Sequence, residues 1–282
     1  MKKILVPTDF SANSRAGIRF ALRWAALEKL ELIFVHVLHT SRPVEWTDTY
    51  FFRYIEDEAN LFKERLSRFV EDAIRQVKQR PERYQCMILP GMSADLALLD
   101  FCRKRHDIDF ICMSTAGAGG VKKTLGTNTG NLITKSKVPV IAVPKNYKGG
   151  SFKKLMYATD FRDCSNELKS VVAFAKGLKA SLEVLHFTWP NEVMPDKEIV
   201  ESGMRKVSRF PLRLRLEKPD IRYSLTQNLE KCVQTLKPSV LIMFTDQSRN
   251  LLQKIFLSSK SEQLSFHLKT PLLVFQKASH SK

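Results

Sequence analysis

The chain has 282 residues, of which 44% are hydrophobic and 10% aromatic, so it can build a packed core and does not have the composition of a disordered chain. The net charge of +17 divides into +7 for residues 1–146 (23 basic, 16 acidic) and +10 for the remainder (23 basic, 13 acidic), which excludes a basic tail and favours polyanionic partners in general. No run approaches the roughly 18 apolar residues of a membrane helix, and the N-terminus carries no signal-peptide pattern, so we expect a soluble, cytoplasmic protein with no membrane partner.

Short apolar runs alternate with helical periodicity through the first half of the chain. The predicted strands span residues 4–6, 32–38, 86–89, 110–113 and 138–143. The predicted helices span residues 12–27, 55–77, 94–103 and 127–135. Ser11 is the expected N-cap of the first helix and Ser93 that of the third. Strands that are apolar on both faces and separated by helices indicate an open, mostly parallel sheet with helices on both faces.

The second half of the chain repeats the first. Residues 2–10 and 153–161 share a lysine pair, an apolar run and the sequence Thr-Asp-Phe, at an offset of 151. Three later runs recur in the same order, with the offset falling from 150 to 130: 32–37 at 182–187, 110–113 at 240–243 and 138–143 at 270–275. We therefore expect two tandem copies of one five-stranded α/β domain, over 1–146 and 152–277, joined by a linker at 144–151.

The second copy is shorter between its second and fourth strands. Residues 196–208 are compatible with a helix, and Pro211 bars its continuation. Residues 212–216 alternate leucine and arginine as in a half-buried strand, and the state of 209–220 stays undecided.

In an open parallel sheet, ligands bind at the carboxyl ends of the strands, where the strand order reverses. Three segments of the first copy end at this edge: Pro7-Thr8-Asp9, His36-Val37-Leu38 and Met113-Ser114-Thr115. A glycine-rich loop at 116–120 follows the last of these, and Gly126-Thr127-Asn128-Thr129 opens a helix, so backbone N–H groups and a helix N-terminus could face a phosphate. Asp9 can accept from a ribose hydroxyl or an adenine amino group. Glycines also occur at strand-to-helix turns only because the turn needs their backbone conformations, so their spacing alone does not show that a nucleotide binds.

Five motifs of the first copy are distinctive: Pro7-Thr8-Asp9-Phe10-Ser11, His36-Val37, Met113-Ser114-Thr115 before a glycine loop, Gly126-Thr127, and Val138-Pro139-Val140. Together they resemble the universal stress protein family, over essentially all of residues 1–146 and more thinly in the second copy. ATP-binding members of the family carry a glycine, two residues, a second glycine, nine residues, and a third glycine followed by Ser or Thr. Here Ser114 stands at the first glycine, Gly117 at the second, and eight residues precede Gly126-Thr127, so the pattern lacks one glycine and one residue.

The resemblance implies an adenine-nucleotide alpha-hydrolase-like fold and an adenine nucleotide such as ATP, with magnesium, in the first copy. It implies that Asp9 and the backbone of Val37 hold the adenosine. The residues implied at the phosphates are Gly117, Gly126, Thr127 and Asn128, and those implied to line the pocket are Pro7, Thr8, Met113, Ser114 and Ala116. No general base is evident, so at most slow ATP hydrolysis is expected. The second copy keeps Asp160 but has no glycine between Met243 and Pro271, so we expect it to lack this site and to pack against the first copy.

Three hypotheses for function stay open. The first is a stress-response regulatory protein that binds ATP or another adenine nucleotide. The second is an interaction module that binds no nucleotide and contacts an unknown protein partner, and pairing of two chains into a homodimer also stays open. The third is association with nucleic acid through the charge of +17. The sequence offers no catalytic set and no third ligand near His36 and His39 for a metal, and the aromatic segment 46–54 is either a lid or a protein contact.

Overall fold

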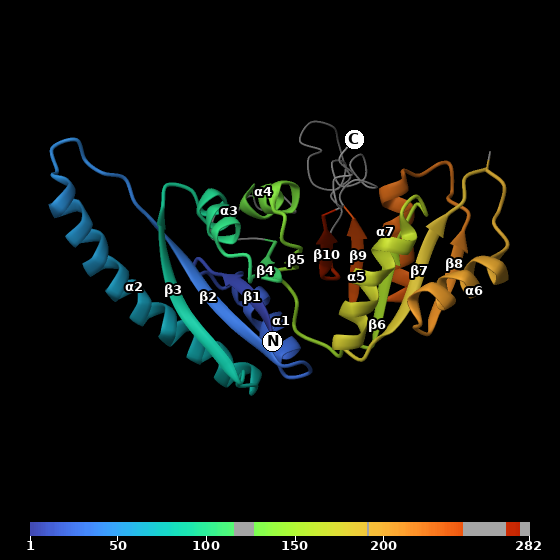
Figure 1. Ribbon diagram of the computed structural model, residues 1–282, viewed down its shortest axis with the longest axis horizontal. Helices are drawn as coiled ribbons and strands as arrows, with labels where there is room; N and C mark the ends of the chain where they lie inside the picture. Colours follow the sequence, from blue (N-terminus) through green and yellow to red (C-terminus); the bar gives the residue numbers. More distant parts are fainter. Residues whose placement is uncertain (116–126, 191, 245–268, 277–282) are drawn as a thin grey trace. The chain divides into compact units, whose positions relative to one another are not determined.

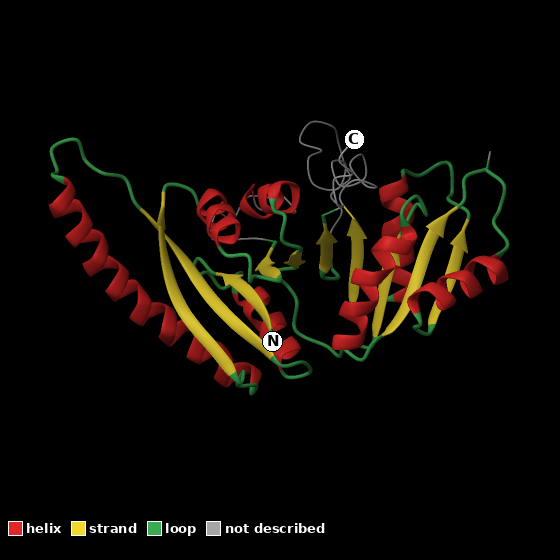
Figure 2. Cartoon of the chain, viewed as in Figure 1, coloured by secondary structure: helices red, strands yellow, loops and turns green. Residues whose placement is uncertain are grey.

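The computed structural model describes residues 1–115, 127–190, 192–244 and 269–276 (Figures 1 and 2). The chain divides into two compact units, Met1–Gly149 and Gly150–Lys282, and the division lies inside the segment 144–151. Each unit is built around a parallel sheet with helices packed on it, so the predicted α/β fold class is confirmed. Within the described ranges, no helix combines the length and the apolar character that crossing a membrane requires.

The first unit contains five parallel strands. They are β1 (Lys2–Pro7), β2 (Leu30–His39), β3 (Arg83–Gly91), β4 (Phe110–Ser114) and β5 (Val140–Val143). Their order in the sheet is β3-β2-β1-β4-β5. The chain moves outward from β1 to β3 and then returns to β4 on the other side of β1, so the strand order reverses between β1 and β4. Every residue of β4 and β5 is buried, as expected for strands covered on both faces.

Four helices connect these strands. They are α1 (Arg15–Ala25), α2 (Asp48–Val77), α3 (Ala94–Lys104) and α4 (Thr127–Lys135). Helices α1 and α2 pack together on one face of the sheet, and α3 and α4 pack together on the other (Figure 2). Right-handed crossovers require this division, because the connections through α1 and α2 run in one direction along the sheet and the connection through α3 runs back.

The second unit has the same strand order. Its strands are β6 (Lys154–Ala158), β7 (Ser181–Phe187), β8 (Leu212–Glu217), β9 (Val240–Phe244) and β10 (Leu272–Phe275). They are parallel in the order β8-β7-β6-β9-β10, which matches the first unit strand for strand. The described helices are α5 (Cys164–Gly177), α6 (Lys197–Ser208) and α7 (Leu225–Leu236). Helix α6 takes the place of α2 at less than half its length, which accounts for the fall in the repeat offset.

Two expectations at helix starts need correction. The first helix begins at Arg15 with Ser14 as its N-cap, so the expectation that Ser11 caps it was wrong. Ser11 instead accepts a hydrogen bond from the backbone N–H of Ser14 (3.1 Å), inside a turn that precedes the helix. Helix α2 begins at Asp48 rather than at residue 55, because the Thr47 hydroxyl accepts from the N–H of Tyr50 (3.3 Å) and caps an extra two turns.

The undecided stretch 209–220 contains strand β8. Arg209 ends helix α6 in a left-handed conformation (φ 48°), and the chain then pairs with β7 from Leu212 to Glu217. Its side chains alternate at first between buried leucine and exposed arginine, as an outer strand with one covered face requires.

Candidate functional site

A tight turn joins β1 to α1 in the first unit. The N–H of Thr8 donates to the carbonyl of Val35 (2.9 Å), which continues the ladder between β1 and β2 by one residue. The Thr8 hydroxyl accepts from the N–H of Phe10 (3.2 Å), and a carboxylate oxygen of Asp9 accepts from the N–H of Ser11 (3.0 Å). Phe10 lies in the left-handed region (φ 61°). These bonds fix the direction of Asp9, whose side chain is exposed at the carboxyl end of the sheet.

His36 supports this turn from β2. Its Nδ1 lies 2.9 Å from the carbonyl oxygen of Thr8, so Nδ1–H is the donor. The imidazole stacks on Phe62 of α2 (ring centroids 5.3 Å apart, planes 4° apart) and touches Phe10 (4.3 Å), over which the guanidinium of Arg65 lies at 4.5 Å. Burial lowers the pKa of His36 and the nearby Arg65 charge adds to this, although the bond to Thr8 opposes it. The imidazole is therefore neutral near pH 7 and acts as a fixed support.

The end of β4 lies beside the end of β1. Leu5 pairs with Ile111, so Pro7 and Met113 are neighbours where the strand order reverses. Gly17 of α1 packs against the β4 backbone so closely that a Cβ on it would lie 3.0 Å from the backbone of Met113. A side chain at this position would push α1 away from the strand end.

Helix α4 starts against the same strand end. The hydroxyl of Thr129, in its first turn, donates to the carbonyl of Ser114 (3.1 Å). The hydroxyl of Ser114 itself is buried and has no hydrogen-bond partner among the described residues. A helix N-terminus and an unused buried hydroxyl therefore lie together at the point of strand reversal.

The described part of the chain brings six of the expected site residues to one end of the sheet. They are Pro7, Thr8, Asp9, Val37, Met113 and Ser114. Asn128 is exposed in the first turn of α4. Ala116, Gly117 and Gly126 lie outside the described residues, as does the side chain of Thr127, so the expected phosphate contacts stay a prediction.

The same turn recurs in the second unit. The N–H of Phe161 donates to the Thr159 hydroxyl and the N–H of Arg162 to the Asp160 carboxylate, both at 3.0 Å, and Phe161 has φ 65°. His186 again places Nδ1 3.0 Å from the carbonyl of Thr159 and stacks on Phe161. The turn and its histidine therefore form in both units, although the second unit has no glycine after its fourth strand.

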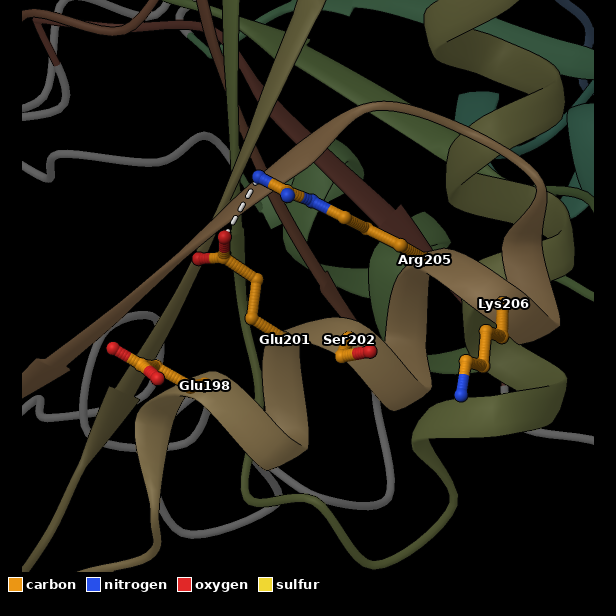
Figure 3. Close-up of a pocket in the computed structure, with 5 residues that line it drawn as sticks. All are labelled: Glu198, Glu201, Ser202, Arg205 and Lys206. Carbon is orange, nitrogen blue, oxygen red and sulfur yellow. Dashed lines mark ion pairs between the residues drawn. The ribbon is translucent and has the colours of Figure 1, made fainter.

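Sequence reasoning missed a second group of clustered polar side chains, on α6. Glu198, Glu201, Ser202, Arg205 and Lys206 lie on one face of this helix and line an open hollow of about 440 Å³ (Figure 3). Glu201 and Arg205 point toward one another and form an ion pair of 2.7 Å. The Glu201 carboxylate also accepts from the N–H of Leu214 (2.6 Å), and Arg205 Nε donates to the carbonyl of Leu212 (2.9 Å). Two of the five residues that line the hollow are therefore already bound to β8, and the spacing of Glu201 and Arg205 by four residues was the only sequence signal for them.

The described ranges hold no cluster of three or more His, Cys, Asp or Glu side chains suited to a metal ion.

Comparison with known proteins gives consistent matches. A model of the universal stress protein family matches residues 1–144. The universal stress protein MJ0577 of Methanocaldococcus jannaschii is 24% identical over 155 residues, which cover 51% of this chain and 95% of that protein. The crystal structure of a universal stress protein from Archaeoglobus fulgidus DSM 4304 covers 99% of this chain and 97% of its own, at 16% identity and a TM-score of 0.64. A putative universal stress protein from Pseudomonas aeruginosa UCBPP-PA14 covers 98% of this chain and 93% of its own, at 14% identity and a TM-score of 0.58. At these identities the structural likeness concerns the fold alone.

Proposed function

Because the chain belongs to the universal stress protein family, we propose that it is a cytoplasmic stress-response regulatory protein whose first unit binds an adenine nucleotide such as ATP, with magnesium. The site lies at the carboxyl ends of β1, β2 and β4. The observation that carries the proposal is that the Asp9 carboxylate and the backbone of Val37 lie at the carboxyl ends of the adjacent strands β1 and β2, beside the point where the strand order reverses.

The backbone of Val37 is suited to an adenine ring. The carbonyl of Val35 accepts from Thr8, so Val35 faces β1. The backbone groups of every second residue in a strand point to the same side, so the N–H and C=O of Val37 point to the side of β1 as well. Strand β1 ends opposite Val35, so it does not pair with these groups of Val37. Its N–H and carbonyl can pair with the edge of a base. The exposed Asp9 carboxylate, already oriented by Ser11, can accept from the ribose hydroxyls.

The phosphates would lie between the ends of β4 and α4. The start of α4 offers N–H groups and the positive end of the helix dipole, with Thr127 and Asn128 in its first turn. Gly117 and Gly126 would let the backbone approach the phosphate oxygens. The buried hydroxyl of Ser114, which has no partner in the described ranges, would lie beneath them.

We propose that the second unit does not bind nucleotide in this way. Its counterpart of Asp9, Asp160, forms an ion pair with Arg162 (3.5 Å), which offsets its charge. The segment between Met243 and Pro271 contains no glycine to admit a phosphate.

Calorimetric titration of the full chain with ATP and magnesium tests the proposal. Asp9→Asn keeps the oxygen that accepts from Ser11 but removes the charge, so we expect affinity to fall by roughly 10-fold to 100-fold. Gly126→Asp places a carboxylate against the phosphates, and we expect no measurable binding. The matched control is Asp160→Asn, the same change in the same turn of the second unit, and it should leave the affinity unchanged.

Three outcomes would count against this assignment. No binding by the wild type at millimolar ATP would remove the nucleotide function. ATP binding that is unchanged in both Asp9→Asn and Gly126→Asp would exclude the proposed location of the site. An effect of Asp160→Asn equal to that of Asp9→Asn would contradict the difference between the two units.

A second candidate function is an interaction module that works without nucleotide. The observation in its favour is the exposure of large aromatic side chains at the start of α2, where Tyr50 is 58% and Phe52 67% exposed. Monomeric proteins seldom leave such side chains clustered on the surface without a partner. Failure of the ATP titration, together with an unchanged fold, would favour this candidate.

A further inference from the structure

The outer edge of β3 carries backbone groups that the first unit leaves unused. The carbonyl of Gly91 accepts a hydrogen bond from the N–H of Thr40, which follows β2 (3.2 Å). The odd-numbered residues of β3 therefore point their backbone N–H and C=O groups toward β2. Tyr84, Cys86 and Ile88 therefore turn their N–H and C=O groups away from the sheet. In the described part of the chain, no group hydrogen-bonds to them.

The second unit covers the corresponding edge. Strand β8 takes the position of β3, and the backbone N–H and C=O groups of Leu212 and Leu214 point away from β7. Glu201 of α6 accepts from the N–H of Leu214, and Arg205 donates to the carbonyl of Leu212. The ion pair between these two side chains, visible in Figure 3, holds both in place. They substitute for a neighbouring strand, which is one way in which proteins prevent edge pairing. The comparison makes the uncovered edge of β3 a specific property of the first unit.

Helix α2 lies above β2 and β3 and extends one side toward this edge. Phe62 stacks on His36 of β2, while the hydroxyl of Tyr84 of β3 donates to Glu71 and the hydroxyl of Ser67 lies beside the thiol of Cys86. The side of α2 above the β3 edge follows from these contacts and from helical spacing. It carries Glu56, Lys63, Ser67 and Glu71, and Lys78 follows directly as the C-cap of the helix.

We propose that two copies of the chain associate through β3, which pairs antiparallel with β3 of the second copy and places Cys86 opposite Cys86. In this register Tyr84 lies opposite Ile88 of the second copy, and Ile88 opposite its Tyr84. All three outward residues then form hydrogen-bonded pairs, each exchanging two N–H···O=C bonds, so no outward group between Tyr84 and Ile88 is left over.

The antiparallel pairing of the two β3 strands has a two-fold axis at Cys86, and this axis also brings complementary charges of the two α2 helices together. Strands are about 4.8 Å apart, and α2 lies over β2 and β3, so the two copies of α2 would run antiparallel with axes about 10 Å apart, a normal packing distance. Ser67 lies beside Cys86 and so near the axis, and residues equally far from Ser67 on either side meet. Lys63 then meets Glu71 of the second copy, and Glu56 meets its Lys78. Both contacts join opposite charges, and this self-complementarity favours a second copy over an unrelated peptide.

Sedimentation of the full chain from low to high micromolar concentration, with amide hydrogen exchange at residue resolution, tests the pairing. We expect a monomer–dimer equilibrium in which the amides of Tyr84, Cys86 and Ile88 exchange at least tenfold more slowly in the dimer. A chain that stays monomeric at the highest concentration would overturn the proposal. So would a dimer in which these three amides exchange as fast as in the monomer.

A charge swap tests the register. Glu56 and Lys78 are both exposed, so their substitution should leave the fold intact. Glu56→Lys or Lys78→Glu alone should raise the dimer dissociation constant roughly tenfold, because each reverses two symmetric ion pairs, and the double variant should restore it to within about threefold. Asp57→Lys makes the same charge change on another side of α2 and should have little effect. A double variant no tighter than the singles, or a control as weak as Glu56→Lys, would overturn the proposed contact.

Discussion

Glu183 is a carboxylate held between two cations in the sheet of the second unit. It is 7% exposed on β7, with Lys154 of β6 at 2.6 Å and Arg215 of β8 also bound to it. Burial alone would raise its pKa, but the hydrogen bonds from Lys154 and Arg215 outweigh burial and hold the pKa below the ordinary value of 4.5. Glu183→Gln removes the charge and leaves both cations facing each other. A fully buried pair broken on one side costs about 3–5 kcal/mol. Because the Lys154 and Arg215 side chains are 35% and 40% exposed, we expect a loss of about 1–2 kcal/mol.

The pH dependence follows from the direction of this shift. A carboxyl whose pKa is lowered by folding stabilises the folded state above its unfolded pKa, and this stability is lost as the pH falls through the lower folded value. The difference between wild type and Glu183→Gln should therefore be full near pH 7 and shrink well below about pH 4.5. Urea unfolding at both pH values, with hydrogen exchange of β7 to report on the second unit, measures it. Glu198→Gln, an exposed carboxylate on α6, is the control. An equal loss at both pH values, or no loss near pH 7, would refute the reasoning.

Three further predictions concern single side chains. In urea unfolding, Phe10→Ala should lower the free energy of unfolding by about 2 kcal/mol and Phe161→Ala by only about 1 kcal/mol. The reason is that the Phe10 ring packs on more aromatic partners than the Phe161 ring does in the equivalent turn. Equal losses of stability would contradict this. Glu201→Ala should cost about 1–2 kcal/mol and speed exchange of the Leu214 amide, which an unchanged exchange rate would disprove. Since folding lowers the pKa of His36, acidification from about pH 7 to about pH 5 should destabilise the first unit. This loss of stability should be absent in His36→Asn, whose side-chain amide can still donate a hydrogen bond. If the variant loses stability with pH as the wild type does, His36 is not the cause.

The sequence predicted the central strands of the first unit well because they are buried on both faces, whereas the order of the strands in the sheet came from the structure. Runs such as 110–113 contain little besides apolar residues, and helix 127–135 has the same bounds in the structure. The start of α2 was missed because residues 48–54 project beyond the buried part of the helix, so they carry no periodic signal. Residues 212–216 did alternate as a half-buried strand does, but this run is short and follows a predicted helix directly, so the state of 209–220 stayed undecided.

The candidate site was predictable only in part. Asp9 and Val37 were expected from their position at strand ends, and in the structure they lie at the carboxyl ends of the adjacent strands β1 and β2. The contacts of Glu201 and Arg205 with β8 could not be predicted, because a local helix pair gives no indication of which distant backbone groups it reaches. The support of the β1–α1 turn by His36 depends likewise on the pairing of β1 with β2.

The turn after β1 and its copy after β6 are closed by their own threonine and aspartate side chains and by one histidine. Nothing in this arrangement needs a bound molecule to keep its shape. A duplicated gene can therefore change the ligand chemistry of one copy while both copies continue to fold, and the two halves of the chain are free to diverge in what they recognise without diverging in architecture.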